Sequence, residues 1–267
     1  AWITIRVRLK VLGRRQDKFM SFMQESLFVL PYFRERTFPG KKGRLRTTPR
    51  VDTSNPIYDH SLETKHIHLA ARWSHYIGDW DFGLAHFRGT SREPLLVPAI
   101  SKSGEPVLLP RYDIINQTSL DVQATKGDWL WKLEALHRSG QGDPYYAATG
   151  GFEYTYVGIT DSAMDLGVLA EYLYDERGNQ APQPFENDLF LGLRLTANDV
   201  QSSELLTGII RDLDSSALLF NLEASRRLGQ AWKLSAQARF WIDVPVDGPL
   251  FDFSQDDYLE LNLARYF

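Results

Sequence analysis

The chain of 267 residues has no cysteine, and this absence excludes several kinds of chemistry. Without cysteine there is no disulfide framework, no thiolate metal site and no cysteine nucleophile. The sequence also lacks an apolar run of the roughly 20 residues that a membrane-spanning helix needs. Basic residues are not in excess, since 30 Lys and Arg stand against 34 Asp and Glu. This balance argues against a nucleic-acid partner, which a basic excess would indicate.

From about residue 60 onward, the chain alternates apolar and polar residues in segments separated by Gly, Asp, Asn and Pro clusters. Within 189–196, for example, a leucine stands at every second position. A β-strand sends such leucines to one face and the intervening residues to the other. Segments 218–225 and 232–241 repeat the pattern, and 203–212 repeats it less clearly. The sequence therefore predicts an all-β, antiparallel protein.

A soluble sandwich or small barrel gives the same alternation, but two features favour a membrane barrel. Aromatic residues gather at the ends of the apolar faces, where membrane barrels carry interfacial girdles. They are Trp73, Trp80, Trp129, Tyr172, Tyr174, Trp232 and Phe240. Apart from 213–215, every second connection is long, as expected of outer loops that alternate with tight periplasmic turns. We expect an antiparallel up-and-down transmembrane β-barrel of about 12–14 strands.

The last ten residues, Tyr258 to Phe267, place leucines at every second position and end on phenylalanine. This segment resembles the C-terminal signature strand of Gram-negative outer-membrane proteins, although Arg265 departs from it. Segments 30–40, 78–84 and 150–155 also resemble a family of uncharacterised proteobacterial, porin-like outer-membrane barrels. The resemblance covers about residues 24–267. It implies a cell outer-membrane location, contact with lipid and the barrel-assembly machinery, and no catalytic residues.

Residues 1–23 are a separate N-terminal segment in this interpretation, and 24–267 form the barrel domain. The alternation from Ile3 to Val11 predicts one more strand, which would bring the total to about thirteen, whereas bacterial single-chain barrels have an even number. Either an upstream strand is missing or 1–23 is a lead-in outside the barrel. We expect a truncated chain.

The polar faces of the predicted strands would line the lumen, and their charged residues carry both signs. The candidate lumen-lining residues are Arg72, Lys132, Glu134, Glu153, Glu171, Arg194, Glu223, Lys233 and Arg239. In a water-filled lumen these charges set the field that a solute crosses, whereas in a narrow lumen they pair and fill it. We expect a channel or transport barrel for small solutes. The alternative is a plugged scaffold barrel that binds a partner through its outer loops, to which the apolar 92–116 loop would contribute.

The predicted outer loop at 34–50 carries seven basic side chains against one acid, Glu35. Arginine forks bind phosphate in a bidentate manner, so this loop is a candidate contact for lipopolysaccharide. The candidate contact residues are Arg34, Arg36, Lys41, Lys42, Arg44 and Arg46. The acidic loop at 243–257 fits no EF-hand spacing.

A lipid-modifying enzyme is the less favoured third class of function. His66 and His68 would share one face of a strand and could begin a metal site or supply a general base. The chain shows no third ligand and no Gly-x-Ser-x-Gly motif. We therefore expect no enzyme activity, no metal and no cofactor.

Overall fold

The computed structural model describes residues 5–12, 22–43, 46–181, 183–246 and 250–267. Most of them lie in long strands connected by turns. The long strands are β1 (Ile5–Leu12), β2 (Phe22–Leu30), β4 (His68–Ile77), β5 (Trp80–Thr90), β8 (Ile114–Lys126), β9 (Trp129–Ser139), β10 (Tyr145–Tyr156), β11 (Asp165–Asp175), β12 (Asn187–Thr196), β13 (Glu204–Asp212), β14 (Leu218–Leu228), β15 (Trp232–Ile242) and β16 (Tyr258–Arg265). Four short 3-10 helices accompany them, namely η1 (Glu63–Lys65), η2 (Ile159–Asp161), η3 (Gly178–Gln180) and η4 (Phe251–Phe253). Within the described ranges, no helix has the length and apolar character needed to cross a membrane.

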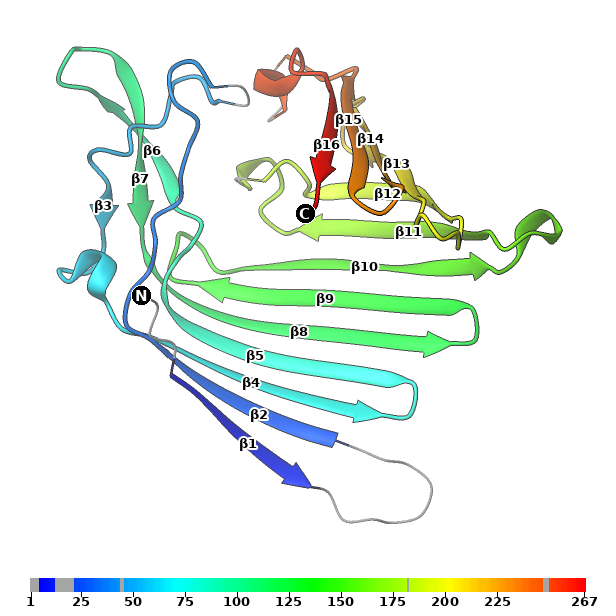
Figure 1. Ribbon diagram of the computed structural model, residues 1–267. Coiled ribbons are helices and arrows are strands. Elements are labelled where there is room, and N and C mark those ends of the chain that lie inside the picture. Colours follow the sequence, from blue (N-terminus) through cyan, green and yellow to red (C-terminus); the bar gives the residue numbers. More distant parts are fainter. Residues whose placement is uncertain (1–4, 13–21, 44–45, 182, 247–249) are drawn as a thin grey trace. The chain divides into compact units, whose positions relative to one another are not determined.

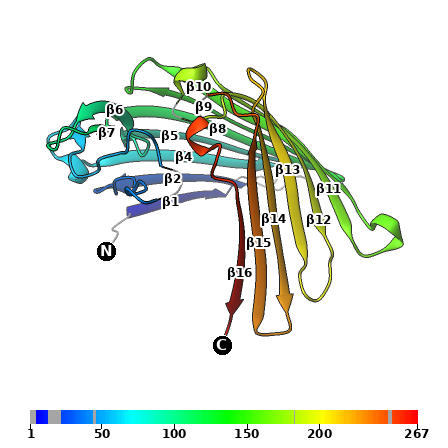
Figure 2. The same ribbon diagram turned by 90° about the horizontal axis from the view of Figure 1, so that it is seen from above.

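The long strands form one antiparallel sheet of 13 strands, in the order β1-β2-β4-β5-β8-β9-β10-β11-β12-β13-β14-β15-β16 (Figures 1 and 2). The order follows the chain except where β3, β6 and β7 are inserted. This result confirms the predicted all-β, antiparallel fold, and β13 confirms the less clear strand at 203–212. Strands β1 and β16 stand at the two ends of the order, so closure into a barrel stays a prediction.

The chain divides into two compact units. Unit 1 comprises Ala1–Gln123 and Leu133–Ala148, and unit 2 comprises Ala124–Lys132 and Thr149–Phe267. In unit 1, β1 pairs with β2 in an antiparallel register that runs from Ile5↔Val29 to Leu12↔Phe22. The expected strand in 1–23 therefore exists and joins the sheet, while the proposed domain boundary after residue 23 stays a prediction.

Unit 1 also holds a second, three-stranded sheet that the sequence did not predict. It consists of β3 (Ile57–Tyr58), β7 (Pro106–Tyr112) and β6 (Leu95–Ile100), in this order, with β3 parallel and β6 antiparallel to β7. We call it the loop sheet, because its strands lie in the expected loops 36–61 and 92–116. It lies at the end of β4 and β5 where η1 is found (Figure 1). The apolar residues of 92–116 thus pair with each other as a hairpin.

The register of β12 to β16 in unit 2 separates two chemically different faces. One row of paired residues runs across the five strands through Leu193, Thr207, Leu222, Ala238 and Leu259. We call this side the leucine face. The adjacent row has Arg194, Leu206, Glu223, Gln237 and Glu260, and we call its side the polar face. Neighbouring positions in a strand point to opposite sides, so the two rows lie on opposite faces.

The leucine face of unit 2 is uncovered. Leu191 and Leu193 are 45% and 46% exposed, and in β16 Leu259 and Leu261 are 65% and 67% exposed. Folding normally removes such side chains from water, at about 25 cal/mol per Å² of apolar surface. A contiguous apolar face of this kind indicates that another apolar phase or partner covers it.

Candidate functional site

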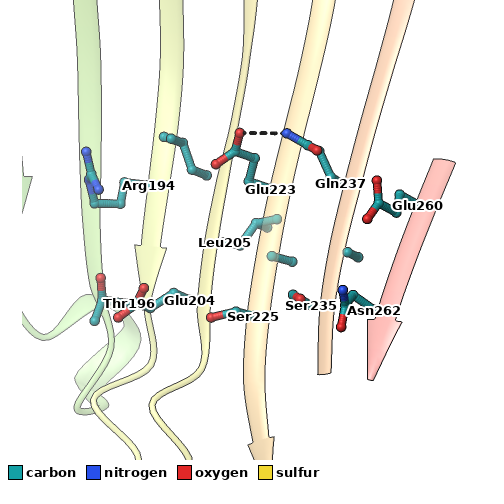
Figure 3. A pocket seen from close by; sticks show the side chains of 13 residues that line it. Arg194, Thr196, Glu204, Leu205, Glu223, Ser225, Ser235, Gln237, Glu260 and Asn262 are labelled. Atoms are coloured by element: carbon teal, nitrogen blue, oxygen red, sulfur yellow. Dashed lines mark hydrogen bonds between the residues drawn. The ribbon is translucent and has the colours of Figure 1, made fainter. Parts of the chain in front are cut away.

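The polar face of unit 2 contains a hollow of about 470 Å³ over β12 to β16 (Figure 3). Two rows of the register supply its polar side chains, and Leu205, Ala224 and Ala236 of the row between them complete the lining. The first is the Arg194 row, and the second contains Thr196, Glu204, Ser225, Ser235 and Asn262. Every strand of this group therefore contributes at least one polar side chain to the same surface.

The hollow has more acidic than basic side chains. Its only arginine among the lining residues is Arg194, which donates to Glu153 from Nε at 2.9 Å and from Nη2 at 3.4 Å. Glu223 accepts a 3.1 Å hydrogen bond from the Gln237 amide (Figure 3). The remaining acid on the Arg194 row, Glu260, has no ion pair with any residue that the structure describes. The lining residues therefore carry a net negative formal charge.

Glycines make room for the charged and aromatic groups of the polar face. A Cβ at Gly167 would come within 2.6 Å of the Glu153 carboxylate that pairs with Arg194. A Cβ at Gly208 would come within 2.5 Å of the Phe190 ring and 2.6 Å of the Leu191 carbonyl oxygen. The ring of Phe190 thus lies directly over a strand position that only glycine leaves open.

Unit 1 carries one strong ion pair on its sheet. Arg72 binds Asp121 in the bidentate manner, with Nη1 and Nη2 at 2.7 and 2.8 Å from the two carboxylate oxygens. Both side chains remain about two-fifths exposed, at 42% and 41%. A Cβ at Gly83 would overlap this pair. The pair connects two strands that are far apart in the sequence, and the alternation of residues does not identify Asp121 as the partner.

The nine predicted lumen residues are distributed over both units. Unit 2 brings four of them together as two pairs, Arg194 with Glu153 and Arg239 with Glu223. The Arg239 guanidinium also donates to Asn221 at 3.2 Å. Two more belong to the same polar face by register. Glu171 pairs with Phe190, and Lys233 pairs with Arg227. Lys132 and Glu134 lie on β9, and Arg72 lies on β4, paired with Asp121. Their role as lumen-lining residues stays a prediction.

Aromatic residues lie at both ends of the unit 2 strands, on the side of the leucine face. At the end with the short turn, Trp129 stacks on Trp131 with ring centroids 5.3 Å apart and contacts Tyr154 at 4.7 Å. At the end with the long connections, the Phe220 and Phe240 rings stack at 5.8 Å. Their role as membrane girdles stays a prediction.

The basic loop at 34–50 is not one uniform patch. Lys41 lies 3.6 Å from Glu105, and Arg50 lies 3.9 Å from the same carboxylate. Arg36 lies over the Phe38 ring, 5.5 Å from its centroid. Two further predicted contact residues, Lys42 and Arg46, are exposed. Arg44 lies outside the described residues.

Phe33 and Tyr112 are the centre of a small buried core between the loop sheet and β4, and the sequence did not reveal it. Both are 1% exposed, and their ring centroids lie 5.3 Å apart. His68 is fully buried beside them, with Nε2 at 3.1 Å from the Thr90 hydroxyl and Nδ1 at 3.0 Å from the Arg92 guanidinium. Because guanidinium only donates, Nδ1 must accept, and His68 is held as the neutral Nε2–H tautomer.

The two histidines expected on one strand face are placed differently. Strand β4 begins at His68, and His66 precedes it. Their ring centroids are 5.1 Å apart, but both nitrogens of His68 are already used by protein groups. In the described ranges, no group of three or more His, Asp or Glu side chains is arranged to hold a metal ion.

A buried acid lies where β11 and β12 are connected. Glu186 is 5% exposed, and its Oε2 has no hydrogen-bond partner in the described part of the chain. Burial raises the pKa of Glu186, and the nearby carboxylates of Asp212, Asp214 and Asp175 raise it further. Folding therefore shifts this carboxyl toward its protonated form.

No family model matches this chain, and no curated protein or solved structure is significantly similar to it. The resemblance to outer-membrane barrels rests on the sequence segments alone and stays a prediction.

Proposed function

We propose that the chain is a cell outer-membrane β-barrel that acts as a porin-like channel for small polar solutes. The observation that carries the proposal is the separation of the sheet into an exposed leucine face and a charged polar face, seen in β12 to β16. In a closed barrel, lipid covers the first face and water fills the space beside the second. Closure also pairs every backbone N–H and C=O, which hydrocarbon requires of a spanning sheet.

The aromatic ends of the strands support a membrane rather than a protein partner as the cover. Trp129, Trp131 and Tyr154 at one end, and Phe220 and Phe240 at the other, flank the leucines. Tyrosine and tryptophan favour the interface between lipid headgroups and tails, because their rings are apolar and their N–H or O–H groups need polar partners.

The polar face supports conduction of polar solutes. Its charged side chains remain partly exposed, with Arg194 at 43% and Glu223 at 50%. Fully paired filler would bury these groups instead. The hollow over β12 to β16 leaves space beside them.

A plugged scaffold barrel is the second candidate, and the loop sheet favours it. Loops 36–61 and 92–116 do not extend freely but form an ordered sheet with a buried core around Phe33 and Tyr112. A compact element of this kind would narrow a lumen or present a binding surface. Conductance separates this candidate from an open channel.

Planar-bilayer recording tests the proposal. The purified chain, refolded into detergent and added to a bilayer in 1 M KCl, is expected to give ohmic conductance steps. The Leu261→Arg variant, which charges the leucine face, is the control that should insert less efficiently than wild type. Protein that inserts into the bilayer but gives no steps would favour the scaffold barrel. Protein that stays in water without detergent, with no insertion, would contradict the membrane assignment.

A further inference from the structure

Unit 1 has a second hollow, of about 390 Å³, that is separate from the polar face of unit 2. The segment that follows β2 forms one side of it, through Arg34, Glu35, Arg36 and Thr37. Thr53 and Thr64 from the following loop supply hydroxyl groups on the other side. We call this site the arginine hollow.

The backbone of the arginine hollow is fixed by contacts with η1 and with the loop sheet. The Phe33 amide donates to the Thr64 carbonyl at 3.0 Å, and the Arg36 amide donates to the Tyr112 hydroxyl at 3.0 Å. Between these two anchors the exposure alternates, with Phe33 buried and Arg34 and Arg36 exposed. Two guanidinium groups are therefore presented from a backbone that is held at both ends, which lowers the entropy cost of binding.

The hollow has more positive than negative charge available to a ligand. In the part of the chain that the structure describes, neither Arg34 nor Arg36 has a carboxylate partner. Arg72 and Arg194, in contrast, each pair with a carboxylate. The only acid in the hollow, Glu35, accepts a hydrogen bond from the Tyr58 hydroxyl.

We propose that the arginine hollow binds a phosphate group. Guanidinium groups donate bidentate hydrogen bonds to phosphate oxygens, and threonine hydroxyls donate to the oxygens that remain. A phosphate carries about −1.5 to −2 charges at pH 7, opposite in sign to the net charge of the two arginines and one acid of the hollow. The phosphate has two possible sources, the headgroup of lipopolysaccharide and a free phosphorylated solute. The choice of lipopolysaccharide rests on the proposed membrane location, whereas phosphate binding does not.

Of the six predicted contact residues in the basic loop, the proposal assigns phosphate binding to Arg34 and Arg36. Lys41 shares Glu105 with Arg50, so its charge is already partly neutralised. Lys42 is exposed and lies outside the lining of the hollow. The pair Lys41 and Lys42 therefore offers a control that removes the same net charge from the same loop as Arg34 and Arg36.

The test compares R34S/R36S with K41S/K42S in detergent-solubilised full chain. Inorganic phosphate is titrated calorimetrically at constant ionic strength, with chloride as the reference anion. Wild type and K41S/K42S are expected to bind phosphate, and R34S/R36S to bind it at least tenfold more weakly. Equal weakening in both variants, or no phosphate binding by wild type, overturns the proposal. Unchanged thermal unfolding of R34S/R36S verifies that the variant folds.

A second arm identifies the source of the phosphate. Proteoliposomes that contain lipopolysaccharide are compared with vesicles of phosphatidylcholine alone. If wild type retains lipopolysaccharide and R34S/R36S does not, the lipopolysaccharide headgroup is the ligand. Phosphate binding in solution without lipopolysaccharide retention assigns a free solute instead. The calorimetric titration needs neither a bilayer nor conductance, so failure of the channel proposal and failure of this proposal are distinguishable.

Discussion

Replacing Leu191 with arginine places a charge at the fifth of the ten residues of β12, in the middle of the leucine face. Its neighbours across the register are Ala170 and Ile209, neither of which can pair with a cation. If lipid covers this face, arginine near the bilayer midplane costs about 2–4 kcal/mol. The equilibrium constant for unfolding would rise by roughly 30-fold or more, since 1.4 kcal/mol is a factor of ten.

Leu228 offers a matched control for this experiment. It is the last residue of β14 and is 42% exposed, close to the 45% of Leu191. Arginine near the interface costs only about 0–1 kcal/mol in a membrane barrel. On a water-exposed face, both substitutions would change the stability by about 0.5 kcal/mol at most, because each side chain is already half exposed.

Urea unfolding in lipid vesicles, followed by tryptophan fluorescence, measures both variants. We expect the free energy of unfolding to fall several times further for Leu191→Arg than for Leu228→Arg. Equal and small changes would refute the argument that the leucine face is in contact with lipid.

Three further predictions concern other parts of unit 2. Replacing Glu223 and Glu260 with glutamine should lower the cation-to-anion permeability ratio severalfold in a KCl gradient, because both acids lie on the polar face. An unchanged reversal potential would place them outside the conduction path. Gly208→Ala should destabilise the protein by about 1–3 kcal/mol in a urea titration, since the new Cβ meets Phe190 and the strand backbone. Because folding raises the pKa of Glu186, its stabilising contribution is complete below the unfolded pKa and is lost as the pH rises through the folded value. Glu186→Gln should therefore raise the urea midpoint more at pH 8 than at pH 4, and an equal gain at both would contradict a burial effect.

The strands could be predicted because one simple periodicity produces them. Leu191 and Leu193 alternate with Gly192 and Arg194, and no other local structure sends such residues to opposite sides. The turn signals then set the ends of each strand. The predicted all-β, antiparallel sheet follows from these two signals alone, and both are local in the sequence.

The loop sheet could not be predicted in the same way. Its parallel pairing of Ile57 and Tyr58 with Arg111 and Tyr112 joins residues more than 50 positions apart. The two residues of β3 are too few to show any alternation. The sequence signal that existed was the unusual apolar content of 92–116, which indicated burial but gave no partner.

The charged residues show the same limit. Alternation assigns Arg72 and Arg194 to polar faces, but it does not say which carboxylate each one meets. Asp121 pairs with Arg72 across 49 positions, and Glu153 pairs with Arg194 across 41. The two contacts also need Gly83 and Gly167 beside them, because a Cβ there would overlap the paired side chains. The sequence alone does not reveal this role of the two glycines. Site geometry of this kind requires the register, which only the folded sheet supplies.

Position-by-position accessibility along β12 tests the central claim most directly. The chain has no cysteine, so single cysteines at 188–196 can each carry a spin label in lipid vesicles. Collisions with oxygen, which concentrates in lipid, and with a water-soluble nickel complex are measured at each position. The account predicts a period of two, with oxygen dominant at Leu189, Leu191, Leu193 and Leu195 and nickel dominant between them. Nickel access that is equal on both faces, or dominant at the leucines, would contradict it.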